Sequence, residues 1–342
     1  MGKKNIIWND YISQKERFAD FFNGVVFQGE KVVCPDALIE LDSKLWRRNR
    51  EKGSYHEYIR DNVKLWEYEG MRYILGLEPE DSPHFALPVK YLNYESIQYD
   101  RQYRAIMKAH RRKKDLCRKE FISGFAENDS LIPVITIGIY LGKEKWSGHT
   151  NLRKMTGLDK VPLRIRERLL RFSNDFHANL FDIHTMDTSE IFETDLREVF
   201  GFLNLQEEKE MLKQYVEENK RFRHLQEDAY EVLLFYSGSS ELEINKEKYK
   251  TEEGYDMCRA IREMIEDGKL EGRIEGRMEG RKEGNLFCLI EKTVKKRERG
   301  MSITEIADAL EEEEIVIERI FTAVQNAGTK ETERIYMFMK KC

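Results

Sequence analysis

The sequence predicts an α/β fold in the N-terminal part of the chain, followed by an α-helical C-terminal tail. Three observations support this prediction. Residues 15–27 carry apolar side chains at helical spacing, residues 62–68 and 71–77 have the character of two short strands, and residues 131–141 are almost wholly apolar and rich in β-branched residues. A helix, a hairpin and a strand buried on both faces, in this order, are typical of a sheet covered by helices.

The composition allows a sizeable core but excludes a globally basic protein. Of the 342 residues, 40% are hydrophobic and 35% are charged, and the net charge is -5. Contact with nucleic acid must therefore come from local basic patches. The five cysteines are scattered and form no C-x-x-C pair, which is typical of reduced thiols rather than of a disulfide framework or a zinc site. We find no secretory signal and no membrane-spanning run, so we expect a cytoplasmic protein.

The remaining elements follow from periodicity. Residues 36–47 repeat the helical spacing, so we expect a second helix there. A third helix is expected over 94–120, after Pro88. Beyond about residue 195 the apolar spacing is helical throughout. These patterns predict four parts: a core over 1–205, a helical extension over 206–267, a linker of E-G-R repeats over 268–285, and a small helical module over 286–342.

The hairpin places two acidic residues opposite each other. If Glu69 and Gly70 form a two-residue turn, Tyr68 pairs with Met71, and Asp61 then lies directly opposite Glu78. Directly opposite side chains share a face, with Cβ atoms about 4.5–5.5 Å apart, and like charges there repel.

A divalent cation would relieve that repulsion. Glu80 lies two residues after Glu78 and would point the same way, so Asp61, Glu78 and Glu80 together would offer oxygen ligands to Mg²⁺ or Mn²⁺. Such an ion lowers the pKa of a bound water and stabilises charge on a phosphodiester. The alternative is that these are ordinary solvated acids at a strand end.

Several segments, in their order and spacing, resemble the Rpn family of recombination-promoting nucleases and transposase-like proteins. They are KERFADFFNGVVFQGEKVVCPDALIELDS (15–43), RDNVK (60–64), YILGLE (73–78), ALPVKYLNYESIQYDRQ (86–102), LIPVITIGIYLGKEKWSG (131–148) and TDLREVFGF (194–202). The resemblance covers roughly the first 235 residues. It implies a PD-(D/E)XK nuclease core with a restriction-endonuclease-like fold, in which helices flank a mixed sheet. It also implies metal-dependent cleavage of double-stranded DNA.

The resemblance also implies site residues. By position the family's two acidic residues correspond to Asp61 and Glu78, the pair that the hairpin brings together. An acid on the first helix corresponds to Glu16, with Asp20 as an alternative one turn later, and a helical glutamine corresponds to Gln102.

The motif departs from the family pattern at its third position. The family has E-x-Q and its wider relatives E-x-K, whereas this chain has Glu78-Pro79-Glu80. Glu80 cannot act as a cationic stabiliser, although it can serve as a ligand or a base. Pro79 lacks a backbone donor, which is tolerated only at an edge or a strand end. The departure therefore bears on catalysis rather than on the fold.

A run of basic residues on the helix after the motif is the strongest candidate for contact with DNA phosphates. On this interpretation each phosphate contact adds salt dependence to binding; the alternative is a solvated helix face. The residues are Arg101, Arg104, Lys108, Arg111, Arg112, Lys113 and Lys114.

The C-terminal region combines a glycine repeat with a helix–turn–helix pattern. Gly272, Gly276, Gly280 and Gly284 recur every four residues, which predicts a helical linker or a self-association segment. Ser302 and Glu305 predict a capping box. The acidic turn that follows, residues 311–314, argues against a DNA-reading helix there.

Together these features predict a Mg²⁺-dependent endonuclease that acts on double-stranded DNA in recombination or transposition. The alternative is a catalytically degenerate member that binds DNA or protein and forms a homo-oligomer through its C-terminal helices.

Overall fold

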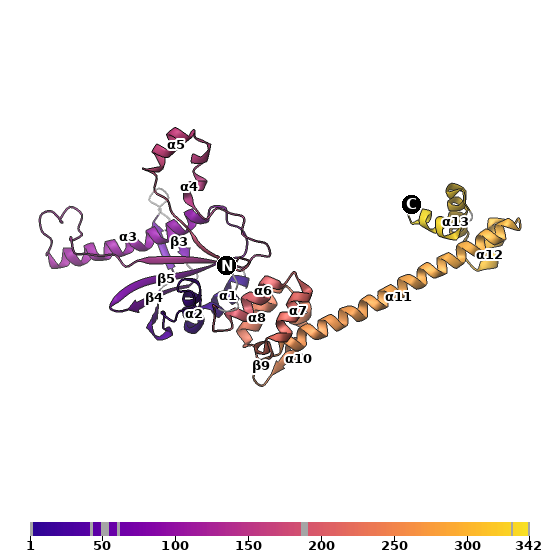
Figure 1. Ribbon diagram of the computed structural model, residues 1–342, viewed down its shortest axis with the longest axis horizontal. Helices are drawn as coiled ribbons and strands as arrows, with labels where there is room; N and C mark the ends of the chain where they lie inside the picture. Colours follow the sequence, from indigo (N-terminus) through magenta and orange to yellow (C-terminus); the bar gives the residue numbers. More distant parts are fainter. Residues whose placement is uncertain are drawn as a thin grey trace. The chain divides into compact units, whose positions relative to one another are not determined.

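A computed structural model describes residues 3–41, 44–48, 55–59, 62–185, 191–329 and 331–340; for residues 3–5, 44–48 and 55–59 it describes the backbone only. The chain forms two compact units, residues 1–262 and 263–342. The first unit is a mixed α/β structure and the second is helical (Figure 1). Among the described residues, no helix combines the length and the apolar character needed to cross a membrane.

A five-stranded mixed sheet is the centre of the first unit. The strand order is β1-β4-β5-β6-β7, and a separate two-stranded sheet pairs β2 with β3. Strands β1, β4 and β5 are antiparallel neighbours, whereas β5, β6 and β7 are parallel. The strands are β1 (Leu38–Glu40), β2 (Lys44–Arg48), β3 (Tyr55–Ile59), β4 (Asn62–Tyr68), β5 (Met71–Glu80), β6 (Val134–Tyr140), β7 (Asn179–Asp182), β8 (Lys250–Thr251) and β9 (Gly254–Tyr255).

Helices surround this sheet. Those of the first unit are α1 (Lys3–Ser13), α2 (Lys15–Val25), α3 (Leu87–Lys113), α4 (Leu152–Met155), α5 (Leu163–Leu170), α6 (Leu196–Leu205), α7 (Lys209–Glu218), α8 (Glu227–Ser237), α9 (Ser240–Ile244) and α10 (Lys246–Tyr249). Three short 3-10 turns, η1 (Pro35–Ala37), η2 (Leu158–Lys160) and η3 (Lys220–Arg223), lie between them. Figure 1 shows α3 continuing past the sheet and the α4–α5 segment projecting from it.

The β4–β5 hairpin has the register that the sequence predicts. Tyr68 pairs with Met71, and the pairing continues to Asn62 opposite Leu77. Glu69 and Gly70 both have positive φ, 49° and 77°, as a two-residue type I′ turn requires. Glutamate is an uncommon first residue in such a turn, but Glu69 adopts the required positive φ. The hairpin therefore fixes which residues of β5 face each side of the sheet.

Alternation along β5 gives the sheet two distinct faces. Ile74 packs with Tyr99 of α3, so every second residue from Ile74 to Glu80 lies on the α3 face. The opposite face carries Phe181 of β7, whose ring contacts Phe21 of α2 and Phe200 of α6. The two faces explain why β6 is almost wholly apolar: it is covered on both sides.

Two parts of the chain differ from the sequence-based expectation. The helix expected over 36–47 is absent: η1, β1 and β2 occupy this segment, and Leu38 pairs with Trp66 at the sheet edge. The apolar spacing fits a helix, but pairing with β4 decides the conformation. The division expected near residue 205 is also not a boundary between units, because α8 packs on α1 and α6 within the first unit.

The second unit is an all-helical module. It contains most of α11 (Met257–Glu298) and then α12 (Ile303–Leu310), α13 (Glu314–Ala327) and α14 (Thr332–Met339). The predicted capping box is confirmed: the Ser302 side chain accepts from the Glu305 amide, and the Glu305 carboxylate accepts from the Ser302 amide. Ile290 of α11 packs with Ile320 and Ile335 in one buried cluster.

Candidate active site

Acidic side chains gather where the three parallel strands end. Glu78 lies beside Gly138 of β6, and Glu80 lies beside Tyr140, which in turn neighbours Asp182 of β7. Glu78 and Glu80 are two residues apart, so both point to the face that α3 covers. The carboxyl ends of parallel strands are a frequent location for ligand sites in open α/β sheets.

Both glutamates of the motif are buried, with exposed fractions of 1% for Glu78 and 6% for Glu80. The Glu80 Oε1 atom accepts hydrogen bonds from Lys90 Nζ at 2.6 Å and from the Tyr91 hydroxyl at 3.0 Å. Both donors come from the first turn of α3. Because a buried carboxylate needs a compensating charge or donors, this pair explains how Glu80 is accommodated.

The Tyr91 hydroxyl interacts electrostatically with both glutamates of the motif. Burial raises the pKa of the Tyr91 hydroxyl well above its usual value, and the negative charges of Glu80 and Glu78 raise it further. The hydroxyl therefore stays protonated and remains a hydrogen-bond donor. A Cβ atom at position 138 would lie 2.2 Å from this hydroxyl, so glycine is required there for Tyr91 to reach the sheet.

The other acids at this edge have structural partners. Asp182 Oδ2 accepts from the Trp146 amide at 3.0 Å, and its Oδ1 accepts from the His184 amide at 3.0 Å. Asp81 Oδ1 accepts from the Tyr236 hydroxyl of α8 at 3.0 Å. These bonds fix the loops after β6 and β7 and hold α8 beside the end of β5.

Asp61, the predicted partner of Glu78, lies outside the described residues. The described part of β4 ends at Asn62, whose side chain donates to Asn9 Oδ1 at 3.1 Å. Pro79 lies beyond this end and pairs only with Ile139 of β6 among the described strands, in agreement with the expectation that it sits at a strand end. Within the described ranges no group of three or more His, Cys, Asp or Glu side chains could hold a metal ion.

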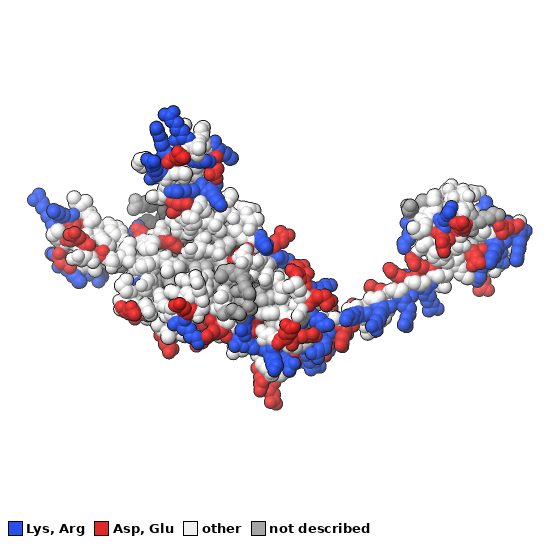
Figure 2. Space-filling model, in the orientation of Figure 1, with Lys and Arg blue, Asp and Glu red and all other residues white. Residues whose placement is uncertain are grey.

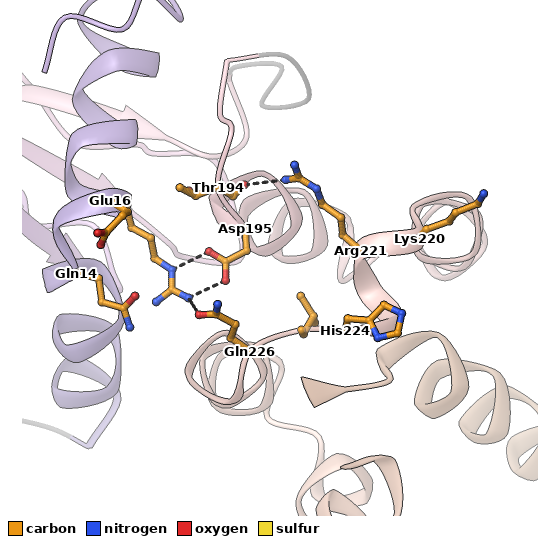
Figure 3. A pocket seen from close by; sticks show the side chains of 10 residues that line it. Gln14, Glu16, Thr194, Asp195, Lys220, Arg221, His224 and Gln226 are labelled. Carbon is orange, nitrogen blue, oxygen red and sulfur yellow. Dashed lines mark hydrogen bonds and ion pairs between the residues drawn. The ribbon is translucent and has the colours of Figure 1, made fainter. Parts of the chain in front are cut away.

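The structure does not bring Glu16 to Glu78. Glu16 is exposed at the start of α2 and lines a pocket of about 670 Å³, across from Lys220 and Arg221 (Figure 3). Its neighbour Arg17 bonds Asp228 at the start of α8, whereas Asp81 bonds Tyr236 eight residues later. Eight residues of helix span about 12 Å, which separates this pocket from the end of β5.

A buried ion network holds that pocket together. The Arg17 side chain is only 4% exposed, and its guanidinium donates to Asp195 Oδ1 at 2.7 Å, to Asp195 Oδ2 at 2.8 Å and to Asp228 Oδ1 at 3.0 Å. The alternative acid, Asp20, accepts from the amides of Glu193 and Thr194 at 3.0 and 2.7 Å. Both groups join α2 to the segment before α6, which gives each of them a structural role.

Gln102 also lies away from the motif. Its amide side chain bonds both main-chain groups of Ile132: Nε2 donates to the oxygen at 3.1 Å and Oε1 accepts from the amide at 2.6 Å. Ile132 precedes β6 by two residues, and Glu78 lies beside Gly138, so about 20 Å of strand separates them. We therefore assign Gln102 to the positioning of β6 and leave it out of the candidate site.

The predicted basic run lies along the part of α3 that extends past the sheet (Figures 1 and 2). All seven residues predicted to contact phosphates are exposed, and Arg104 Nε lies 2.8 Å from Asp100 Oδ2. At a rise of about 1.5 Å per residue, Arg111 is about 30 Å along the helix from Tyr91. The structure therefore places this run on the same helix as Lys90 and Tyr91, but far from them.

A second basic surface was missed by the reasoning from sequence. Residues 152–172, which we call the α4–α5 arm, carry a net charge of +5 within a chain of net charge -5. Figure 2 shows these basic side chains on the projecting segment. Five arm cations are exposed and form no ion pair with a described residue: Lys154, Lys160, Arg164, Arg168 and Arg171. The charge density of the RIRERLLR stretch was the available signal.

Lys90 and Tyr91 were also missed. Their signal was weak, because a lysine and a tyrosine at the start of a helix are ordinary surface residues until the fold brings them to Glu80.

Comparison of the sequence with models of protein families and with curated proteins, and of the structure with solved structures, found no match. Any function therefore has to be argued from the chain itself.

Proposed function

We propose that the chain is a restriction-endonuclease-like protein of the Rpn kind, a metal-dependent DNA endonuclease that hydrolyses phosphodiester bonds in recombination or transposition. The observation that carries this proposal is the register of the β4–β5 hairpin. Asn62 lies opposite Leu77, and the same pairing taken one residue further would set Asp61 against Glu78. The family resemblance selects the same two positions independently.

The donor set fits a hard divalent cation in part. Asp61 and Glu78 would hold Mg²⁺ or Mn²⁺ through carboxylate oxygens, with water completing the shell, as is usual for Mg²⁺. Glu80 fits poorly as a third ligand, because Lys90 already lies 2.6 Å from its Oε1 atom. When bound, the ion would supply an activated water and charge stabilisation at the phosphate.

The chain's own residues then have separate roles. Lys90 is the positive charge beside Glu80, and its side chain is 24% exposed, so it can reach a phosphate oxygen from the solvent side. Glu80 and Tyr91 position it. In this arrangement the cation that the E-x-K pattern places on the strand comes instead from α3, while Glu80 orients it.

Two basic surfaces would hold the DNA backbone. The exposed cations at the end of α3 lie about 30 Å from Tyr91 along the helix, close to one turn of B-DNA at about 34 Å. They would therefore contact phosphates about one helical turn from the cleaved bond. The α4–α5 arm offers further contacts, and none of these needs a specific base sequence.

A plasmid-nicking assay with Mg²⁺ tests the proposal. We expect the wild-type chain to nick supercoiled DNA and EDTA to abolish the activity. Asp61→Asn and Glu78→Gln should each reduce nicking by more than the roughly 10- to 100-fold that changes around a metal site commonly cause. Glu67→Gln is the matched control, because Glu67 is exposed on the same hairpin and pairs with Arg72. Wild-type activity in a folded Asp61→Asn protein would remove Asp61 from the mechanism.

A second candidate function is a catalytically degenerate protein that binds DNA or protein and self-associates through its helical tail. Two observations favour it: Glu78 is only 1% exposed, and Glu80 is already paired with a lysine. DNA binding that is unchanged by EDTA, together with no cleavage under Mg²⁺ or Mn²⁺, would select this alternative. Nicking that requires the metal and Glu78 would reject it.

A further inference from the structure

The long helix α11 carries a four-residue repeat of glycine, a basic residue, an apolar residue and glutamate between Gly268 and Glu283, with Lys282 in the last apolar place. Successive residues of a helix point about 100° apart, so each residue type forms its own stripe. We define three stripes: the apolar stripe is Leu270, Ile274 and Met278, the Arg stripe is Arg273, Arg277 and Arg281, and the Glu stripe is Glu271, Glu275 and Glu279.

The apolar stripe has no partner among the described residues. Its side chains are 55%, 51% and 57% exposed, and every residue from 266 to 282 is exposed. The glycines are not needed for packing within the chain, because a Cβ atom at Gly272, Gly276 or Gly280 would meet nothing within 4 Å. Three large apolar side chains in a row on one solvated helix face indicate an interaction surface.

The charges of the repeat have few opposite charges at the right spacing within the helix. From residue 271 to 281, every charged residue has a like charge four positions away, and Glu279, with Lys282 three positions later, is the one residue with an opposite charge three or four positions away. Like charges at this spacing destabilise a helix, and each glycine adds about 1 kcal/mol against alanine. None of these six charged side chains forms an ion pair with a residue that the structure describes. These exposed side chains are therefore available to pair with opposite charges of another molecule.

The arrangement of the stripes selects the partner and its direction. Measured around the helix, the Arg stripe lies about 100° to one side of the apolar stripe and the Glu stripe about 100° to the other. When two copies face each other through the apolar stripe in parallel, the Arg stripe of each lies against the Glu stripe of the other on both sides. In an antiparallel pair, Arg would face Arg and Glu would face Glu.

We propose that α11 pairs in parallel with the α11 of a second copy of this chain, through the apolar stripe. A four-residue period drifts about 40° per repeat around a helix, so the contact is short and centred on Ile274. Ridges of this spacing pack at a crossing angle of about -50°. The glycine stripe, about 160° away, faces outward.

The pairing has a consequence for the N-terminal units. Because the helices are parallel, both copies of the first unit are attached at the same end of the pair. The inference specifies the self-association of the second candidate function, but it holds whether or not the core cuts DNA. Its test therefore reads assembly rather than activity.

Sedimentation equilibrium of the full chain tests the surface. We expect a dimer for the wild type, and at least a tenfold weaker dimer for Ile274→Asp, which places two opposed carboxylates at the centre of the contact. The side chain is exposed, so folding should be unaffected, as circular dichroism can verify. Gly276→Ala, on the opposite stripe, is the matched control and should keep the dimer. A monomeric wild type, or a dimer weakened by Gly276→Ala and not by Ile274→Asp, would overturn the proposal.

Cysteine cross-linking tests the direction. In a background where Cys34, Cys117, Cys288 and Cys342 are serine, Leu270→Cys should form an intermolecular disulfide by itself under mild oxidation. In an antiparallel pair centred on Ile274, position 270 would instead meet position 278 of the other copy. Cross-links that appear only when Leu270→Cys and Met278→Cys proteins are mixed would reject the parallel arrangement.

Discussion

At the scale of single residues, the candidate site depends on the glycine at position 138. Gly138 leaves the space in which the Tyr91 hydroxyl approaches the sheet, and this hydroxyl and Lys90 hold Glu80. A Cβ atom at position 138 would lie 2.2 Å from that hydroxyl and 2.9 Å from Leu180 Cδ1. Contacts under 3 Å cannot be accommodated without movement, so position 138 controls the geometry around both glutamates.

We predict that Gly138→Ala lowers the free energy of unfolding by about 1–3 kcal/mol, as overpacking in a core does. In a Tyr91→Phe background the loss should be smaller, because the nearest clashing atom is gone. Urea denaturation of the four proteins, followed by tryptophan fluorescence, measures this coupling. If Gly138→Ala lowers the free energy of unfolding equally in both backgrounds, the clash with Leu180 rather than the clash with Tyr91 limits the size of the side chain at position 138.

At the scale of elements, α3 joins the candidate site to a basic, projecting end. Its C-terminal turn is closed by His110, whose Nδ1 lies 2.6 Å from Asp115 Oδ1 and whose Nε2 lies 2.8 Å from Asp129 Oδ2. The hydrogen bond with Asp115, and then that with Asp129, raises the pKa of His110 above its usual value. The bond with His110 is also the main cause that lowers the pKa of Asp115.

We predict that the loop over residues 115–129 is held most firmly at mildly acidic pH. The raised pKa of His110 means that its contribution is complete below about pH 6.5, the usual histidine value, and is lost as the pH rises through the raised value. The lowered pKa of Asp115 means that its contribution is present above about pH 3.9 and is lost as the pH falls through the lowered value.

Protection factors from hydrogen exchange, corrected for the intrinsic rates, measure this prediction. Protection of the loop amides should be higher at pH 6 than at pH 9. His110→Gln should remove that difference while leaving the sheet amides unchanged. Equal protection at both pH values in the wild type would show that the ion pairs with Asp115 and Asp129 do not hold the loop.

At the scale of the whole molecule, positive charge is concentrated while the chain as a whole is acidic. The α4–α5 arm has a net charge of +5 against -5 for the chain, and it also exposes Phe172 at 89% and Leu163 at 59%. Such a distribution attracts a polyanion to one part of the surface and repels it elsewhere. If the chain binds DNA, the arm should therefore account for a large share of the salt dependence.

We predict that replacing Arg164, Arg168 and Arg171 with glutamine weakens binding to duplex DNA and flattens its salt dependence. Each lost phosphate contact lowers the slope of log K against log salt by about 0.9, so three contacts give up to about 2.7. Fluorescence anisotropy across a salt series measures the slope. The control removes three exposed cations away from the arm, at Lys31, Arg72 and Lys209. An equal slope for the arm variant and the wild type would exclude the arm from the interface.

The sequence by itself determined the elements whose pattern is local. The β4–β5 register followed from a two-residue turn, the buried strand from an apolar run, and the capping box from Ser302 and Glu305, because each depends on neighbours a few residues apart. The same reasoning failed over residues 36–47, where the apolar spacing fits a helix but pairing between Leu38 and Trp66 makes an edge strand.

Only the tertiary structure decided which polar groups meet. Glu80 acquires Lys90 and Tyr91 because α3 crosses the sheet above Gly138, whereas Glu16 and Gln102 lie at other places in the same unit. These contacts join residues that no local spacing relates, and their energies depend on burial that exists only after the helices pack. The local sequence pattern therefore predicted the strands that carry the acidic residues. The long-range packing of α3 on the sheet determined which side chains bond to them.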